Sequence, residues 1–339
     1  MVFMKRFILL FFLFASISSC FGPYKAPSDN VIIRQIDFAN NLTLFFYQNS
    51  INVRDQYGNT PLIASMKSEN KEIALLLLNS GANINLQDNS GYTPLMSAID
   101  SQNLEVANLL IKKGANVNIQ SNSGDSSLII AIARYYKDLD ELIFRNTSQF
   151  NIENRLSKES FTSEVELLNK NVKYLIETLL NKGANIDLQN DIGDSALILA
   201  IENGNHSIIK YISDSQNLNS VLKNKNEDLK NFIINKGANI NLQNNIGNSS
   251  LMIESEEGNK NLVELLINKG ANINVKNKNS VDCLMLAVKS GNKDLVEFFV
   301  NKGIDVNNKD IFGKTALNYA EENNIPLEKN KELIEILKK

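Results

Sequence analysis

The chain has 339 residues and a formal net charge of −3, from 35 basic and 38 acidic side chains. This mildly acidic balance, with no basic stripe along the sequence, argues against nucleic acid as a partner. One histidine and two cysteines are too few to build a metal site of those residue types or a disulfide framework. Stability must therefore come from apolar packing.

Residues 1–19 have the pattern of an export signal. Lys5 and Arg6 form a basic start, an apolar run follows from residue 7 to residue 14, and small residues come next. The apolar run is too short to cross a membrane, which takes about 20 apolar residues. We therefore expect this segment to be a cleaved signal peptide.

The end of the signal carries a more specific motif. Ile17-Ser18-Ser19-Cys20 resembles the bacterial lipobox, in which the cysteine is acylated and becomes the first residue of the mature chain. The resemblance implies lipidation of Cys20 and stable anchoring to a membrane of the bacterial envelope, on its periplasmic or its surface side. With Cys20 lipidated, residues 20–30 are expected to form a flexible tether. The alternative is ordinary cleavage near Ser19, with Cys20 left as a thiol.

From Gly58 onward the sequence repeats itself. Gly58, Gly91 and Gly124 lie 33 residues apart, and the phrase Gly-Ala-Asn-Ile-Asn begins at positions 81, 237 and 270, with variants at 114, 183 and 303. Such a fixed period indicates a stack of units, each of which buries its apolar face only against its neighbours. Residues 31–57 are interpreted as a degenerate N-terminal capping repeat, because Asn52 lies 33 residues before Asn85.

Each period carries the signals of two helices. Thr60 is a predicted N-cap and Pro61 suits the first helical position, which indicates a helix over residues 62–68. A second and strongly apolar helix is predicted over 73–78, and Gly81 supplies the left-handed residue that ends it. We assign the leucine, isoleucine and valine side chains of these helices to a core between repeats.

Gly58-Asn59-Thr60-Pro61-Leu62 and its counterpart at 91–95 resemble the signature of ankyrin repeats. The resemblance implies an all-α solenoid of helix-turn-helix repeats with short β-hairpin-like loops over residues 58–339. Glu254 stands where the family has alanine, so we expect it to need a partner or to leave its repeat loose. The implied repeats start near residues 58, 91, 124, 193, 247, 280 and 313.

Two insertions interrupt the period, at about residues 136–171 and 214–228. Gly114 and Gly183 are 69 residues apart, which allows either a hidden whole repeat or one repeat with an insertion, and we favour the insertion. Both segments are polar, so we expect solvent-exposed excursions on one edge of the stack. The first is predicted to add helices of its own at Asp138–Phe144 and Ser163–Asn169.

Nothing in the sequence indicates catalysis. The single histidine, His206, falls in a predicted turn, no Gly-x-Ser-x-Gly elbow surrounds a serine, and the glycines belong to repeat turns. We therefore predict a binding protein that is not an enzyme and has no catalytic residue, cofactor or metal.

The ankyrin resemblance implies that a partner binds the residues beside each hairpin glycine and those at the end of the first helix. Large side chains at the hairpin tips are candidate hot spots. We expect Ile192 and Ile246, which precede hairpin glycines, to pack against the neighbouring hairpin instead. The predicted partner-binding residues are Gln56, Tyr57, Asn59, Lys67, Asn89, Ser90, Tyr92, Asp100, Asp125, Asp194, Asn248 and Phe312.

The resulting hypothesis is a membrane-anchored scaffold for protein–protein interaction in the bacterial cell envelope. One alternative is an envelope-stress or structural protein that stabilises a periplasmic enzyme. Another is a surface-exposed ligand for host proteins.

Overall fold

The computed structural model describes residues 51–68, 70–147, 157–211, 216–322 and 327–338. The chain divides into two compact units, residues 1–83 and 84–339. The predicted signal, Cys20, the tether and most of the predicted capping repeat lie outside the described residues. Within the described ranges, no helix has both the length and the apolar character of a membrane span.

The described part of the first unit contains one helix pair, α3 (Pro61–Lys67) and α4 (Lys71–Asn79). Thr60 caps α3 by accepting a hydrogen bond from the backbone N–H of Ile63, and Pro61 occupies the first turn. Asn70 caps α4 in the same way. These bounds and caps agree with the helices predicted from the sequence.

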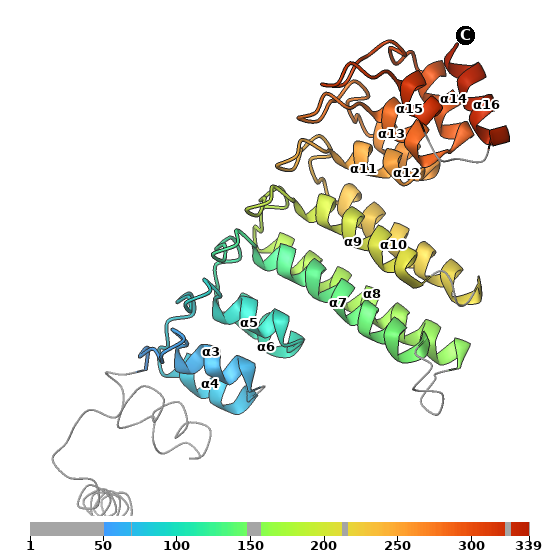
Figure 1. The fold of residues 1–339 in the computed structure, drawn as a ribbon. Helices are drawn as coiled ribbons and strands as arrows, with labels where there is room; N and C mark the ends of the chain where they lie inside the picture. Colours follow the sequence, from blue (N-terminus) through green and yellow to red (C-terminus); the bar gives the residue numbers. More distant parts are fainter. Residues whose placement is uncertain (1–50, 69, 148–156, 212–215, 323–326, 339) are drawn as a thin grey trace, which may run out of the picture. The chain divides into compact units, whose positions relative to one another are not determined.

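The second unit repeats this pair along its length. The first helices of successive repeats contact one another in one row, from α5 to α15, and second helices such as α6, α8 and α10 form the next row (Figure 1). The predicted helix-turn-helix repeats are confirmed. The helices are α5 (Pro94–Asp100), α6 (Leu104–Lys112), α7 (Ser127–Thr147), α8 (Lys158–Asn181), α9 (Ala196–Tyr211), α10 (Gln216–Asn235), α11 (Ser250–Glu256), α12 (Lys260–Asn268), α13 (Cys283–Ser290), α14 (Lys293–Asn301), α15 (Ala316–Glu322) and α16 (Leu327–Leu337).

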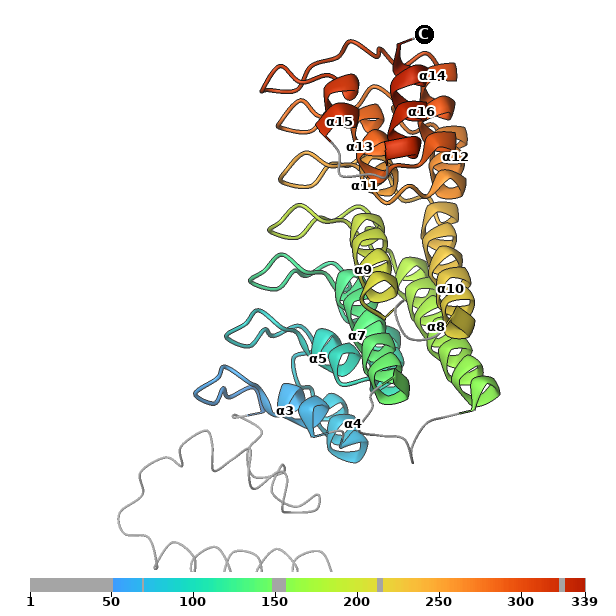
Figure 2. The same cartoon turned by 45° about the vertical axis from the view of Figure 1, so that its right-hand side comes forward.

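The hairpins of the second unit all project from the same side of its first helices (Figure 2). In four of these hairpins a glutamine joins the hairpin to the next one. Gln87 Nε2 donates to the Gly91 carbonyl at 2.7 Å within its own hairpin and to the Gln120 carbonyl of the next hairpin at 2.9 Å. Gln120, Gln189 and Gln243 repeat the contact to the following hairpin at 3.0, 2.9 and 3.0 Å. These bonds satisfy carbonyl groups that the short hairpins leave unpaired.

The recurring asparagines form a second ladder. Asn85 Oδ1 accepts from the backbone N–H of Asn116, and Asn118 Oδ1 accepts from that of Asn185, at 2.8 and 2.7 Å. Hairpins approach so closely that a Cβ on Gly91, which has φ of 78°, would lie 2.5 Å from the backbone nitrogen of Asn122. Gly91 is therefore favoured twice, by its left-handed backbone and by this contact.

The structure differs from the prediction for the two insertions. The described residues of the insertions do not form polar excursions from the stack; they lengthen α7, α8, α9 and α10. The predicted helices 138–144 and 163–169 lie inside α7 and α8, and His206 lies inside α9 and not in a turn. Apolar side chains of the inserted residues, including Leu139 and Phe161, are buried between the long helices.

A buried polar network joins the long helices. The Tyr136 hydroxyl lies 2.8 Å from the Ala200 carbonyl oxygen and 2.7 Å from Oδ1 of Asn226, and it hydrogen-bonds to these acceptors. Asn226 Nδ2 donates to the carbonyl of Gly204. A Cβ on Gly204 would lie 2.5 Å from Asn226 Nδ2, so this helical glycine makes room for the asparagine. The network links α7, α9 and α10.

Glu254 has the partner that its position demands. Its side chain on α11 is 0% exposed and forms an ion pair of 2.7 Å with Lys230 Nζ of α10, which is 2% exposed. The partner comes from the lengthened helix next to the second insertion. Because a buried carboxylate requires a cation or donors, this pair fixes α10 against α11, and the repeat is not loose.

Two adjacent leucines of α6 differ in burial, which gives a stability prediction with its own control. Leu110 is 0% exposed, whereas its neighbour Leu109 is only half-buried. We expect Leu110→Ala to lower the free energy of unfolding by about 2–5 kcal/mol and Leu109→Ala by clearly less, because only the first leaves a core cavity. Denaturant unfolding measures both. Equal losses would contradict this assignment of the two leucines to core and surface.

Candidate partner-binding surface

Each repeat has a pair of positions eight residues apart, and we call this pair the inner corner. The first position directly follows the hairpin residue with a left-handed backbone, which is a glycine in every repeat but one and Ser280 in that repeat, and the second lies on the first helix. In the first unit, Lys67 Nζ donates to Asn59 Oδ1 at 2.6 Å. In the last repeat, Lys314 Nζ forms a 2.5 Å ion pair with Glu322. The full set of corners is Asn59/Lys67, Tyr92/Asp100, Asp125/Ala133, Asp194/Glu202, Asn248/Glu256, Val281/Lys289 and Lys314/Glu322.

The structure places the predicted partner-binding residues in three environments. Two of them are buried: Asn59 at 8% exposure and Asp194 at 1%. Their side chains serve the inner corner and do not offer a free contact surface. Tyr92, Asp125 and Asn248 are half-buried, and the exposed residues are Gln56, Tyr57, Lys67, Asn89, Ser90, Asp100 and Phe312.

Large apolar side chains stand exposed at the hairpin tips. Ile192 and Ile246 are 61% and 60% exposed, so the expectation that they pack against the neighbouring hairpin is wrong. Only their backbones make that contact: the Ile192 carbonyl accepts from Asn245 N–H at 2.9 Å, and the Ile246 carbonyl accepts from Lys278 N–H at 3.1 Å. Ile311 and Phe312 are likewise exposed, at 56% and 76%.

The inner corner of α9 differs from the others because it holds two carboxylates. Neither oxygen of Asp194 has a hydrogen-bond donor, although the side chain is almost fully buried. Burial, reinforced by the negative charge of Asp194, raises the pKa of Glu202 to about 7. Burial also raises the pKa of Asp194, and the charge of Asp125 adds to this. The corner therefore retains a proton up to neutral pH.

Glu202 was absent from the residues predicted from the sequence. The signal that could have found it is the spacing within the corner, because Glu202 follows Asp194 by the same eight positions that separate Lys67 from Asn59. In later repeats a lysine from the next corner neutralises the carboxylate instead. Glu256 pairs at 2.5 Å with Lys289, which is the second position of the following corner.

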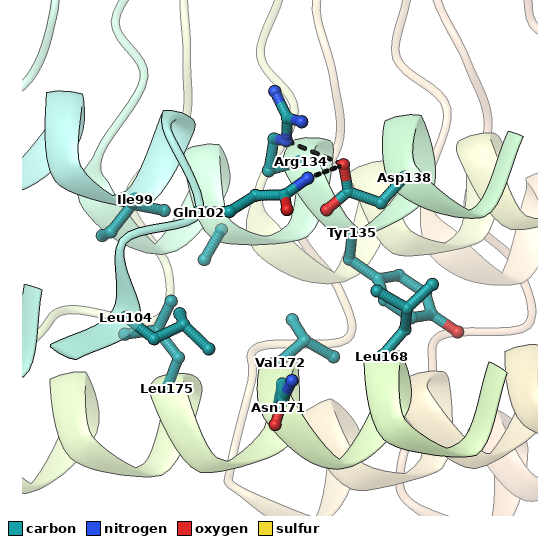
Figure 3. Close-up of a pocket in the computed structure, with 11 residues that line it drawn as sticks. Ile99, Gln102, Leu104, Arg134, Tyr135, Asp138, Leu168, Asn171, Val172 and Leu175 are labelled. Atoms are coloured by element: carbon teal, nitrogen blue, oxygen red, sulfur yellow. Dashed lines mark hydrogen bonds and ion pairs between the residues drawn. The ribbon is translucent and has the colours of Figure 1, made fainter. Parts of the chain in front are cut away.

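A cavity of about 120 Å³ lies where α7 and α8 run past the ends of α5 and α6 (Figure 3). Its wall is mainly apolar, and one edge is polar. At that edge Asp138 accepts from Gln102 Nε2 at 2.5 Å and pairs with Arg134 Nε at 2.8 Å. The apolar lining comes from Ile99, Leu104, Ala131, Leu168, Val172 and Leu175.

The remaining reactive groups are placed as follows. Cys283 is a fully buried free thiol at the start of α13, and burial raises its pKa to about 12, so the thiol stays protonated at neutral pH. The described residues contain no group of three or more His, Cys, Asp and Glu side chains that could hold a metal ion.

Comparison with known proteins defines the class. The family model described as ankyrin repeats (3 copies) matches residues 34–121, 165–277, 218–310 and 251–339, so the chain belongs to the ankyrin-repeat family. The structure is similar to the crystal structure of the ankyrin repeat domain of Bcl-3, a unique member of the IkappaB protein family. That match has a TM-score of 0.55 and 19% identity, and it covers 83% of this chain and 99% of the Bcl-3 chain. No match was found among curated proteins.

The carboxylate pair predicts a pH-dependent stability. The pKa of Glu202 is raised from 4.5 to about 7, so the native state binds the extra proton between those values. Its contribution to stability is complete below pH 4.5 and is lost as the pH rises through 7. Glutamine does not ionise, so Glu202→Gln should not lose this stability at high pH. We expect its free energy of unfolding to exceed that of wild type by on the order of 1 kcal/mol at about pH 8.

Urea unfolding at about pH 4 and pH 8 tests the effect, because the two proteins should converge at the acidic value, where Glu202 is neutral. Glu264→Gln on α12 is the matched control, because Glu264 is 44% exposed and its ion pair with Lys260 is long, at 3.9 Å. Its difference from wild type should change little with pH. A Glu202→Gln variant less stable than wild type at pH 8 would overturn the carboxylate-pair assignment.

Proposed function

We propose that the protein is a non-catalytic scaffold that binds a protein partner through its hairpin tips and inner corners. The observation that carries the proposal is a set of exposed apolar side chains at hairpin tips of one unit: Ile192 and Ile246 on two neighbouring hairpins, and Ile311 and Phe312 on the second hairpin after Ile246. Exposed aromatic and aliphatic side chains on a rigid support are suited to anchoring a partner. Ankyrin repeats generally mediate protein–protein interaction, and the family membership supports the same reading.

The packing of the repeats supports this choice of surface. The apolar faces of the first helices are used in stacking: Leu95, Leu197 and Leu251 are all at most 1% exposed. The tips instead hold apolar side chains in solvent, on hairpins fixed by the glutamine and asparagine ladders. Since these hairpins are already ordered, a partner would pay little conformational entropy to bind them.

Replacing Ile192, Ile246 and Phe312 with serine should weaken partner binding by about tenfold or more while leaving the melting curve nearly unchanged. Leu167→Ser on α8 is the matched control, because Leu167 is 56% exposed but lies on a second helix. A photoreactive residue at position 246 identifies the partner by cross-linking, and calorimetry then compares the variants. Loss of binding in the control but not in the tip variant would refute the assigned surface.

We further propose that the scaffold is lipid-anchored to the bacterial cell envelope through Cys20. Support comes from the basic start, the short apolar run and the Ile17-Ser18-Ser19-Cys20 motif at its end. Several acyl chains on one cysteine would hold the protein stably, unlike a single myristoyl chain.

Cys20→Ala should release the protein from the membrane fraction, because the proposed anchor is attached to that side chain. Cys283→Ala is the natural control: it removes the other cysteine, whose side chain is buried at 0% exposure, and should leave the protein with membranes. Fractionation after a high-salt wash, with labelled palmitate, distinguishes the two. Retention of Cys20→Ala in the membrane fraction would refute the lipid anchor.

A further inference from the structure

The α9 inner corner lacks the lysine that occupies one of its two positions in the corners of α3, α13 and α15. In the first unit, Lys67 fills the corner by donating to Asn59. In the last repeat, Lys314 and Glu322 form an ion pair across the same two positions. The α9 corner has Asp194 and Glu202 at these two positions. It therefore has an acidic residue where the other two corners have a lysine.

The electrostatics of this corner are uncompensated within the described residues. No ion pair there involves Asp194 or Glu202; the contact that Glu202 receives is a 3.3 Å hydrogen bond from Asn244 Nδ2. Asp194 is buried at 1% exposure with both oxygens unpartnered, which is costly for a carboxylate. Asp125 of the preceding repeat adds a further negative charge, which also raises the pKa of Asp194. A cation placed between Asp194 and Glu202 would replace the retained proton and stabilise the ionised form of both carboxylates.

We propose that the α9 inner corner binds the ammonium or guanidinium group of a lysine or arginine presented by a protein partner. This inference rests on the proposed scaffold function and specifies the chemistry of its partner. Glu202 is half-buried and can contact the incoming cation directly, and the buried carboxylate of Asp194 adds negative charge close to it. The cation then takes the place between the two carboxylates that Lys67 takes beside Asn59.

The surroundings favour a protein segment over a free cation. Ile192 stands at the tip of the hairpin that carries Asp194, and Ile246 at the tip of the next, and both are exposed. A segment with a basic residue between apolar side chains would satisfy the corner and cover the tips together. The neighbouring corners do not compete for it, because Ala133 is uncharged and Glu256 already pairs with Lys289.

Binding of a fluorescein-labelled hexalysine peptide to the full chain, followed by anisotropy at low ionic strength, tests the site. Glu202→Gln should weaken binding by about tenfold. Glu264→Gln removes the same charge from an exposed position on α12 and should change the affinity by less than about twofold. Equal weakening in the two variants would mean non-specific attraction, and no weakening in either would mean that the corner is not the site.

A second variant tests the geometry directly. Glu202→Lys supplies the cation internally, as Lys67 does beside Asn59, so it should abolish hexalysine binding and raise the melting temperature. A lower melting temperature would overturn the view that the corner accepts a cation. If spermidine competes as well as hexalysine at equal concentration, the corner takes a free polyamine, and the assignment to a protein partner is wrong.

These results separate this inference from the proposed function. If the serine variants at the tips lose the cross-linked partner while Glu202→Gln binds hexalysine normally, the scaffold stands and the basic-residue site fails. If Glu202→Gln weakens hexalysine and the tip variants keep the partner, the tip surface fails and the corner stands.

Discussion

The structure depends on the fact that no repeat can bury its apolar face alone. Helices of seven to nine residues, such as α5 and α6, are too short to be stable in isolation, and their buried side chains are covered by the next repeat. Stacking also sets the hairpins in line, where Gln87 and its equivalents bond each hairpin to the next. The apolar helix faces are thus consumed, and the hairpin tips and inner corners remain for binding.

The two insertions obey the same constraint. Their polar composition suggests loops, yet their scattered apolar residues extend the helix faces that neighbouring repeats must cover. The added length creates new buried surface, and the Tyr136–Asn226–Gly204 network and the Lys230–Glu254 pair provide partners for several of its polar groups. A satisfied buried network favours one register of the long helices over its neighbours, because a shift would leave these groups unpaired. The cavity beside α5 and α6 is a consequence of the mismatch in helix length.

The inner corners show one geometry used for two purposes. Where a lysine and a polar or acidic partner meet, as in Lys314 and Glu322, the corner is closed and contributes to the fold. Where two acids meet, as in Asp194 and Glu202, burial raises the pKa of Glu202, so the pair retains a proton. This corner has no lysine to pair with its carboxylates. If the α9 corner binds a basic residue as proposed, a repeat protein could vary the charge of its corners along the stack without changing its backbone, and so discriminate between partners.

The sequence by itself determined the period, the helix caps and the class of fold, because these signals act over a few residues. Thr60 caps the helix that it precedes, and each hairpin glycine sets its own backbone angle. Tertiary structure alone decided that the insertions are helix extensions, that Glu254 pairs with a lysine 24 residues away, and that Ile192 and Ile246 stay in solvent. It also decided the pairing of Asp194 with Glu202. Exposure, pairing and pKa depend on which side chains other repeats bring close, and no local pattern records those neighbours.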